Sequence, residues 1–106
     1  MKWVEIITLR SPGKINTELV DELLKGVGES DSPTDSLNHL LKVKTYCHSV
    51  VETDLSVHIY WESEAGNQHK SPLALSIVSA LRSMGLLNHS VWIESAAREF
   101  KHRPGK

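Results

Sequence analysis

The sequence is poor in cysteine, because Cys47 is the only one among its 106 residues. A single thiol excludes an internal disulfide and the cysteine-rich sites that hold zinc or iron–sulfur clusters. Such usage is typical of a reducing compartment. Met1 also leads straight into an alternating apolar segment without the architecture of a cleavable signal peptide. We therefore expect a cytoplasmic protein.

An excess of one charge is lacking as well, since 12 Lys and Arg residues face 13 Asp and Glu residues and leave a formal net charge of −1. No global field would attract nucleic acid or a membrane surface. No apolar run approaches the roughly 18 residues that a membrane-spanning helix needs. We expect neither nucleic acid nor membrane as a partner. The composition, 40% hydrophobic and 24% charged, is that of an ordinary globular domain.

What the sequence does contain is a regular succession of short periodic segments. Apolar and β-branched residues predict strands over residues 3–9, 41–51, 55–62 and 89–94. Helical spacing predicts two helices, one capped by Asn16 and one beginning at Ser71-Pro72. The order strand-helix-strand-strand-helix-strand predicts an α+β, ferredoxin-like fold, with a four-stranded antiparallel sheet and both helices on one face.

The organisation predicted from this pattern is one domain over residues 1–96 and a basic, frayed tail over residues 97–106. Residues 29–38 form a polar connection that is longer than usual and a candidate lid. Gly85 is expected to end the second helix in the left-handed conformation, with Leu86 returning to Leu81.

The two middle strands are joined by a short connection over residues 52–54, which predicts a hairpin. A register centred on that connection brings opposite charges and aromatic rings together across the strands. The predicted pairs are Lys44 with Glu62, Tyr46 with Tyr60, and His48 with His58.

Strand alternation then divides the sheet into two faces. The expected helix-covered face holds Val4, Ile6, Val43, Cys47, Leu55, Val57, Ile59, Trp61, Val91 and Ile93. The expected opposite face holds Trp3, Glu5, Tyr46, His48, His58, Tyr60, Glu62, Trp92 and Glu94, with Lys42 and Lys44 at one edge. Four aromatic side chains, each covering about 150–250 Å² when buried, exceed what a soluble monomer usually exposes. We expect this face to be covered by a second subunit or by a ligand.

The element order and the sheet face that requires covering resemble the dimeric α/β-barrel superfamily. That superfamily includes antibiotic-biosynthesis-type monooxygenases, haem-degrading relatives and stress-responsive proteins. The resemblance spans residues 3–95 and rests on topology and patterning. It implies a homodimer of two ferredoxin-like subunits paired through their sheets, with small cavities. A monooxygenase-like enzyme without a cofactor, or a small-ligand-binding protein, would fit it. The alternative is a non-catalytic regulatory or interaction module whose sheet face serves only dimerisation.

Candidate site residues lie on the face that is expected to be covered. His58 and His48 are the candidate bases for a substrate that forms a stabilised carbanion, and Tyr60 would position that substrate. The candidate lining of a pocket for a small aromatic ligand consists of Trp3, Tyr46, Trp92 and His89. A filled aromatic dimer interface is the competing interpretation, and the sequence favours it for the aromatic residues.

A metal site is a second functional alternative for His48 and His58. His48 and His58 with Glu5, Glu62 or Glu94 would supply two imidazoles and a carboxylate. No helical or turn spacing enforces ligand geometry, so we expect hydrogen-bonded interface histidines and no metal.

The remaining candidates are explained locally. His89 is expected to form a local hydrogen bond rather than to line a cavity between helix and sheet, and Cys47 to act as a small buried hydrophobe. Solvated side chains are expected for His39, His69 and His102. The stretch from Ser56 to Tyr60 lacks the glycine and arginine of an RNA-recognition signature. The segment from Arg10 to Lys14 is too short for an acylphosphatase-like phosphate loop.

Overall fold

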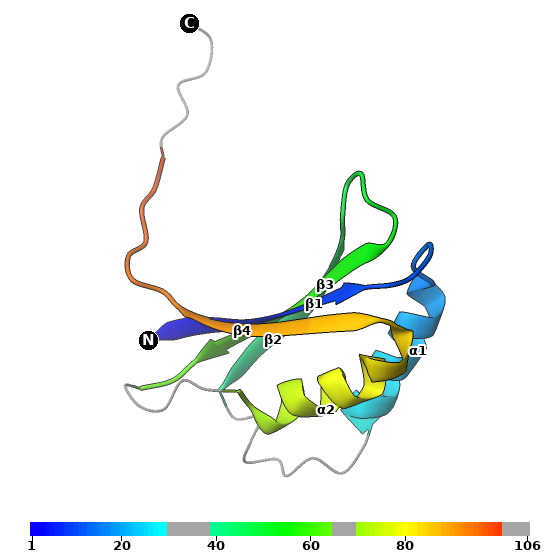
Figure 1. Cartoon of the computed structure of the whole chain (residues 1–106). Helices are drawn as coiled ribbons and strands as arrows, with labels where there is room; N and C mark the ends of the chain where they lie inside the picture. Colours follow the sequence, from blue (N-terminus) through cyan, green and yellow to red (C-terminus); the bar gives the residue numbers. More distant parts are fainter. Residues whose placement is uncertain (30–38, 65–69, 101–106) are drawn as a thin grey trace, which may run out of the picture.

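The computed structural model describes residues 1–29, 39–64 and 70–100 (Figure 1). Its elements are β1 (Lys2–Arg10), α1 (Thr17–Glu29), β2 (Leu40–Cys47), β3 (Asp54–Glu62), α2 (Pro72–Leu81), the 3₁₀ helix η2 (Arg82–Met84) and β4 (Leu86–Ile93). The expected element order is confirmed. Of the candidate lid, Glu29 is the last residue of α1 and residues 30–38 lie outside the residues described, as do His69 and His102. No helix within the described ranges is long and apolar enough to cross a membrane.

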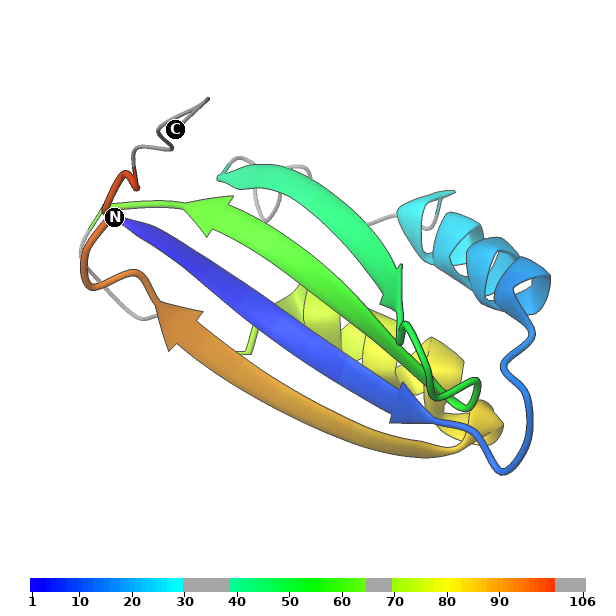
Figure 2. The same cartoon turned by 90° about the horizontal axis from the view of Figure 1, so that it is seen from above.

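The four strands form one antiparallel sheet in the order β2-β3-β1-β4. Both helices lie on the same face of this sheet, as Figures 1 and 2 show. The fold is therefore the α+β, ferredoxin-like architecture that the sequence predicts. We call the face without helices the open face.

Local signals explain where the helices begin. The side chain of Asn16 accepts a hydrogen bond from the backbone nitrogen of Leu19 (3.1 Å), and that of Ser71 accepts one from Ala74 (3.1 Å). Pro72 occupies the first turn of α2, where its missing N–H costs nothing. Both predicted helix starts are confirmed.

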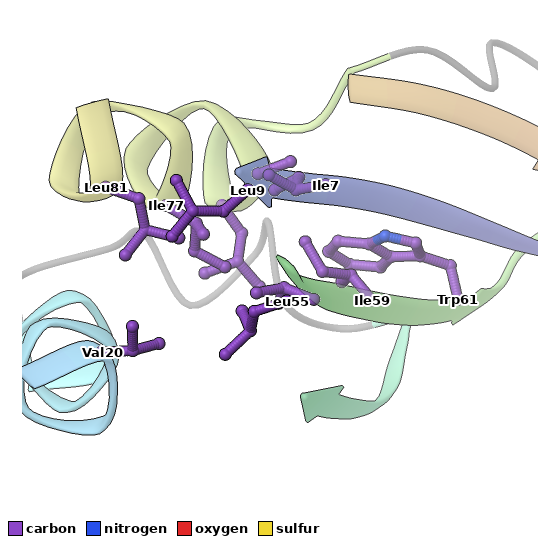
Figure 3. Close-up of a cluster of buried hydrophobic side chains, with 11 residues drawn as sticks. Ile7, Leu9, Val20, Leu55, Ile59, Trp61, Ile77 and Leu81 are labelled. Atoms are coloured by element: carbon purple, nitrogen blue, oxygen red, sulfur yellow. The ribbon is translucent and has the colours of Figure 1, made fainter. Parts of the chain in front are cut away.

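The core lies between the sheet and the two helices (Figure 3). β3 contributes every second residue, as its alternation predicts, and β1 adds Ile7 and Leu9. The helices close this layer with Val20 from α1 and Leu73, Ala74, Ile77 and Leu81 from α2.

The predicted faces of β1 are reversed in the structure. Glu5 pairs with Ile59 and is fully buried, so Trp3, Glu5, Ile7 and Leu9 lie on the helix-covered face. Val4 and Ile6, predicted to be covered, therefore belong to the open face. Because β1 is apolar on both faces, alternation alone could not decide which face the helices cover.

The predicted register of the hairpin is also wrong. Lys44 lies opposite His58 and Tyr46 opposite Ser56. β2 ends at Cys47, and the Nδ1 atom of His48 accepts hydrogen bonds from the backbone nitrogens of Val50 (3.1 Å) and Val51 (2.9 Å). This contact stabilises a connection over residues 48–53, which is longer than the predicted one over residues 52–54. The longer connection shifts the pairing of β2 with β3, but the same residues of β2 still face the open side.

Three further expectations change with the new strand positions. Gly85 is extended (φ 161°, ψ −156°) rather than left-handed, and Leu86 lies opposite Arg10 and is exposed instead of returning to Leu81. Glycine is needed at position 85 because a Cβ there would clash with the carbonyl oxygen of Arg10. Cys47 is exposed at the edge strand, not buried.

We predict that Gly85→Ala lowers the free energy of unfolding by about 1–3 kcal/mol, because the added methyl group must displace the backbone of β1. The matched control is Gly26→Ala in α1, where nothing lies within 4 Å of the added atom. Its better helix propensity should raise the free energy of unfolding by about 0.5–1 kcal/mol. Urea titrations of both variants measure these values. Equal effects of the two substitutions would refute the close-approach explanation.

Candidate functional site

The most buried polar group is the carboxylate of Glu5, at the centre of the sheet. Trp61 donates a hydrogen bond from Nε1 to Oε1 (2.8 Å). The backbone nitrogen of Ser71 (3.0 Å) and the Nε2 atom of His89 (2.9 Å) both donate to Oε2. Ser71 caps α2, so the carboxylate also sits at the positive end of that helix. These contacts tie β1, β3, β4 and α2 together.

This carboxylate cluster explains two residues that the sequence placed in a ligand pocket. The side chain of His89 is 7% exposed and contacts Glu5, 84 positions away in the sequence, instead of forming the local hydrogen bond that was expected. Trp3 stacks on Trp61 at a centroid distance of 5.4 Å and donates to the hydroxyl of Ser63 (3.0 Å). Both side chains belong to the helix-covered face.

We predict that Glu5→Gln lowers the free energy of unfolding by about 1–3 kcal/mol, because an amide offers one acceptor oxygen to three buried donors. Glu62→Gln is the matched control, since Glu62 lies on the same sheet but is exposed. Its effect should stay within about 0.5 kcal/mol. Chemical denaturation monitored by tryptophan fluorescence distinguishes the two. If Glu5→Gln left the free energy of unfolding unchanged, a structural role for the cluster would be contradicted.

The open face has a different composition. Val4 and Ile6 of β1 are half-buried at its centre. Trp92 of β4, opposite Val4, is 60% exposed, and Tyr46 of the edge strand β2 is 42% exposed. Leu86, at the start of β4, is 76% exposed. The face thus combines an apolar centre with large exposed rings.

A hydrogen-bonded network runs along β3 on the open face. His58 contacts the hydroxyl of Ser56 through Nε2 (3.1 Å) and that of Tyr60 through Nδ1 (3.5 Å). The hydroxyls of Tyr46 and Tyr60 lie 3.3 Å apart, and the rings of Tyr46 and His58 pack at 4.5 Å. Lys42 places its ammonium 4.9 Å from the ring centroid of Tyr60. We call Tyr46, Ser56, His58 and Tyr60 the open-face network.

The environment of this network fixes its protonation. Burial lowers the pKa of His58 below its ordinary value of 6.5, so the imidazole is neutral at pH 7 and can accept a proton. The hydrogen bond with Tyr46, followed by burial, raises the pKa of Tyr60 above 10.0. Tyr60 therefore remains a phenol that can donate a hydrogen bond. The open-face network combines a neutral base with phenolic donors.

Two hollows flank the network. The larger, of about 440 Å³, lies at the hairpin end of the sheet, and its lining includes Tyr46, His48, Ser56 and Leu86. Arg10 and Asp54 form a bidentate ion pair at the same hollow (3.0 and 2.9 Å). Arg10 holds the pKa of Asp54 below its ordinary value through these hydrogen bonds. The smaller hollow, of about 250 Å³, lies at the other end, where its lining includes Val4, Tyr60 and Trp92.

The structure brings together some of the candidate residues and separates others. Tyr46, His58 and Tyr60 form one network, while His48 lies beside Tyr46 at the larger hollow but not opposite His58. The metal site that was considered for His48 and His58 required the two side chains to lie opposite each other, and they do not. No group of three or more potential metal ligands occurs in the described part of the chain. Ser56 was missed, although strand alternation places it on the same face.

The geometry defines a ferredoxin-like protein with a network of base and phenols on an uncovered sheet, and its fold resembles that of the antibiotic-biosynthesis monooxygenases. No known family and no curated protein matches the sequence. A mutant of SnoaB, a cofactor-independent oxygenase of Streptomyces nogalater, superposes with a TM-score of 0.59 at 9% identity, over 91% of this chain and 95% of that one.

Two further solved structures have the same fold. A monooxygenase of Streptomyces coelicolor in complex with nanaomycin D gives a TM-score of 0.57 at 17% identity, over 93% of this chain and 92% of that one. A putative antibiotic biosynthesis monooxygenase of Deinococcus radiodurans gives 0.55 at 11% identity, over 94% and 99%. The similarity extends over nearly the whole of both chains in each case.

Proposed function

We propose that this chain forms a homodimer through its open face and that the dimer binds a flat, weakly acidic aromatic molecule for cofactor-free oxygenation. The observation that carries the proposal is the open-face network, in which a neutral histidine lies among phenols beside a hollow of about 440 Å³. That volume falls within the roughly 300–1,000 Å³ of small-molecule sites. The fold shared with cofactor-independent oxygenases supports the reaction type.

Dimerisation is supported by the apolar character of the open face. Val4, Ile6, Trp92 and Leu86 leave a hydrophobic surface that a soluble monomer rarely keeps. A two-fold axis places the same surface on both sides of an interface, so an apolar centre meets an apolar centre. A second copy of the chain is therefore the occupant that we propose.

The proposed chemistry begins with proton abstraction. The Nε2 atom of His58 contacts the hydroxyl of Ser56 (3.1 Å), which lines the larger hollow, so a ligand hydroxyl or an activated C–H group that displaces this contact can reach the base. The resulting anion is held by the hydroxyls of Tyr46 and Tyr60. A substrate methylene that becomes a ketone gives up four electrons to one dioxygen, whose two oxygen atoms end in the ketone and in one water. This balance requires no other electron donor.

The first test uses 2-naphthol as a fluorescent probe. At pH 7 the neutral His58 accepts a hydrogen bond from the probe, and it loses this ability once protonated. We predict that affinity falls about fivefold, the value of one hydrogen bond, as the pH drops below 6.5 through the lowered pKa of His58. Naphthalene, which has no hydroxyl, should bind without this pH dependence.

The matched variants are His58→Gln, which should abolish the pH dependence, and His39→Gln, which should preserve it because His39 is exposed at the start of β2.

An oxygen electrode with 2-tetralone then tests the reaction, since the methylene group of 2-tetralone lies between a ring and a ketone. Binding of the probe without uptake of dioxygen would exclude the oxygenation and indicate a small-ligand-binding protein. No binding at all would favour the non-catalytic interaction module.

The second test concerns the dimer. We predict that Trp92→Glu converts the protein to a monomer in sedimentation velocity, because a buried carboxylate without a partner opposes association by several kcal/mol. Leu75→Glu is the matched control, since Leu75 is 52% exposed on α2, away from the open face. That variant should remain dimeric. A wild-type monomer would overturn the proposed assembly.

A further inference from the structure

The C-terminal segment leaves the body of the protein on its open side. The last backbone hydrogen bond is from the nitrogen of Glu94 to the carbonyl of Lys2 (2.9 Å). Residues 95–100, which we call the arm, are exposed and lack regular structure. Figure 1 shows the arm in orange and red, rising from the sheet on the side opposite the helices. The arm is thus placed where a second subunit would lie.

The arm carries the only phenylalanine of the chain, and this side chain is 89% exposed. An aromatic ring of this size is usually buried, since burial stabilises by about 1.5–3 kcal/mol. No hydrogen bond or ion pair connects residues 95–100 to the rest of the described chain. The surface that buries Phe100 must therefore come from outside the arm's present surroundings.

The size of the open face supports an additional contact. Four strands of eight or nine residues span roughly 28 by 19 Å, or about 500 Å² in projection. A standard interface buries about 800 Å² on each partner. An extended arm that lies on the partner subunit would add to the contact area of the sheets.

We propose that in the homodimer each arm crosses to the partner subunit and places Phe100 over the partner's larger hollow, so that both subunits contribute to each ligand site. This inference rests on the dimer proposed above. It adds Phe100 as an apolar closing wall beside Tyr46 and Leu86, which line that hollow.

Reach decides which hollow the arm can close. In the sheet register Cys47, which lines the larger hollow, is level with Leu87 of β4. From Glu94 the way back to it covers seven residues and three strand spacings, or roughly 27 Å. An arm of six residues extends over only about 20 Å. Even fully extended, the arm therefore reaches no farther than the near rim of its own subunit's hollow, at Asn88 of β4, and cannot cover the side lined by Cys47.

The partner's hollow is within reach when the two-fold axis reverses the strands. In Figure 1 the arm and the hairpin over residues 48–53 rise on the same side of the sheet, at its opposite ends. Two sheets stacked face to face are about 10 Å apart. Reversal brings the base of each arm above the partner's hairpin end.

Cross-linking tests this placement with the natural thiol. Phe100→Cys adds a second cysteine to the exposed Cys47, and a short bis-maleimide can then join the two. We predict a covalent dimer on a denaturing gel for Phe100→Cys. In the wild-type protein and in the double variant Phe100→Cys, Cys47→Ser, the two like thiols of the dimer lie at opposite ends of the interface, beyond the span of a short bis-maleimide, and should yield no such product.

Sedimentation of the same samples separates the two proposals. A non-covalent dimer that yields only intrasubunit cross-links, or none, would overturn the crossing arm while leaving the dimer intact. A monomer would overturn both. A second readout is Phe100→Ala, which should stay dimeric but bind 2-naphthol about tenfold more weakly, the loss of one apolar wall. Unchanged affinity would contradict the closing role of Phe100.

Discussion

The buried carboxylate of Glu5 is the interaction on which the arrangement of this protein depends. A charge without exposure is tolerable only when donors surround it, and Trp61, Ser71 and His89 provide them. These donors come from β3, the start of α2 and β4, so the carboxylate fixes three neighbours of β1 at once. It also fixes which face of β1 is covered. Because Glu5 points toward the helices, Val4 and Ile6 must point away.

The consequence is a sheet whose two faces have separate roles. The helix-covered face is filled by aliphatic side chains and the stacked pair of Trp3 and Trp61. The open face retains an apolar centre and the network of His58, Tyr46 and Tyr60. A folded chain that leaves such a surface uncovered requires a second layer. In the proposed dimer the second subunit is that layer, and it also encloses the polar network in a less aqueous environment.

The comparison with oxygenases of the same fold shows that this chain shares their architecture but not their sequence. At identities of 9–17% the architecture is retained while the side chains on it differ. Function therefore has to be argued from the site itself. In this chain the neutral imidazole, the two phenols and the hollow beside them are the features with chemical consequence, and in the proposed dimer the arm with Phe100 extends that site to the partner.

The sequence by itself determined the element order, both helix starts and the faces of β3, because capping residues and strict alternation are local signals. It also placed Tyr46, His58 and Tyr60 on one face, since a register error of an even number of residues preserves the faces. Only the tertiary structure decided the orientation of β1, the role of His89 and the position of His48. Those depend on which distant donors meet Glu5 and on how the hairpin closes around His48, and such contacts leave no trace in local periodicity.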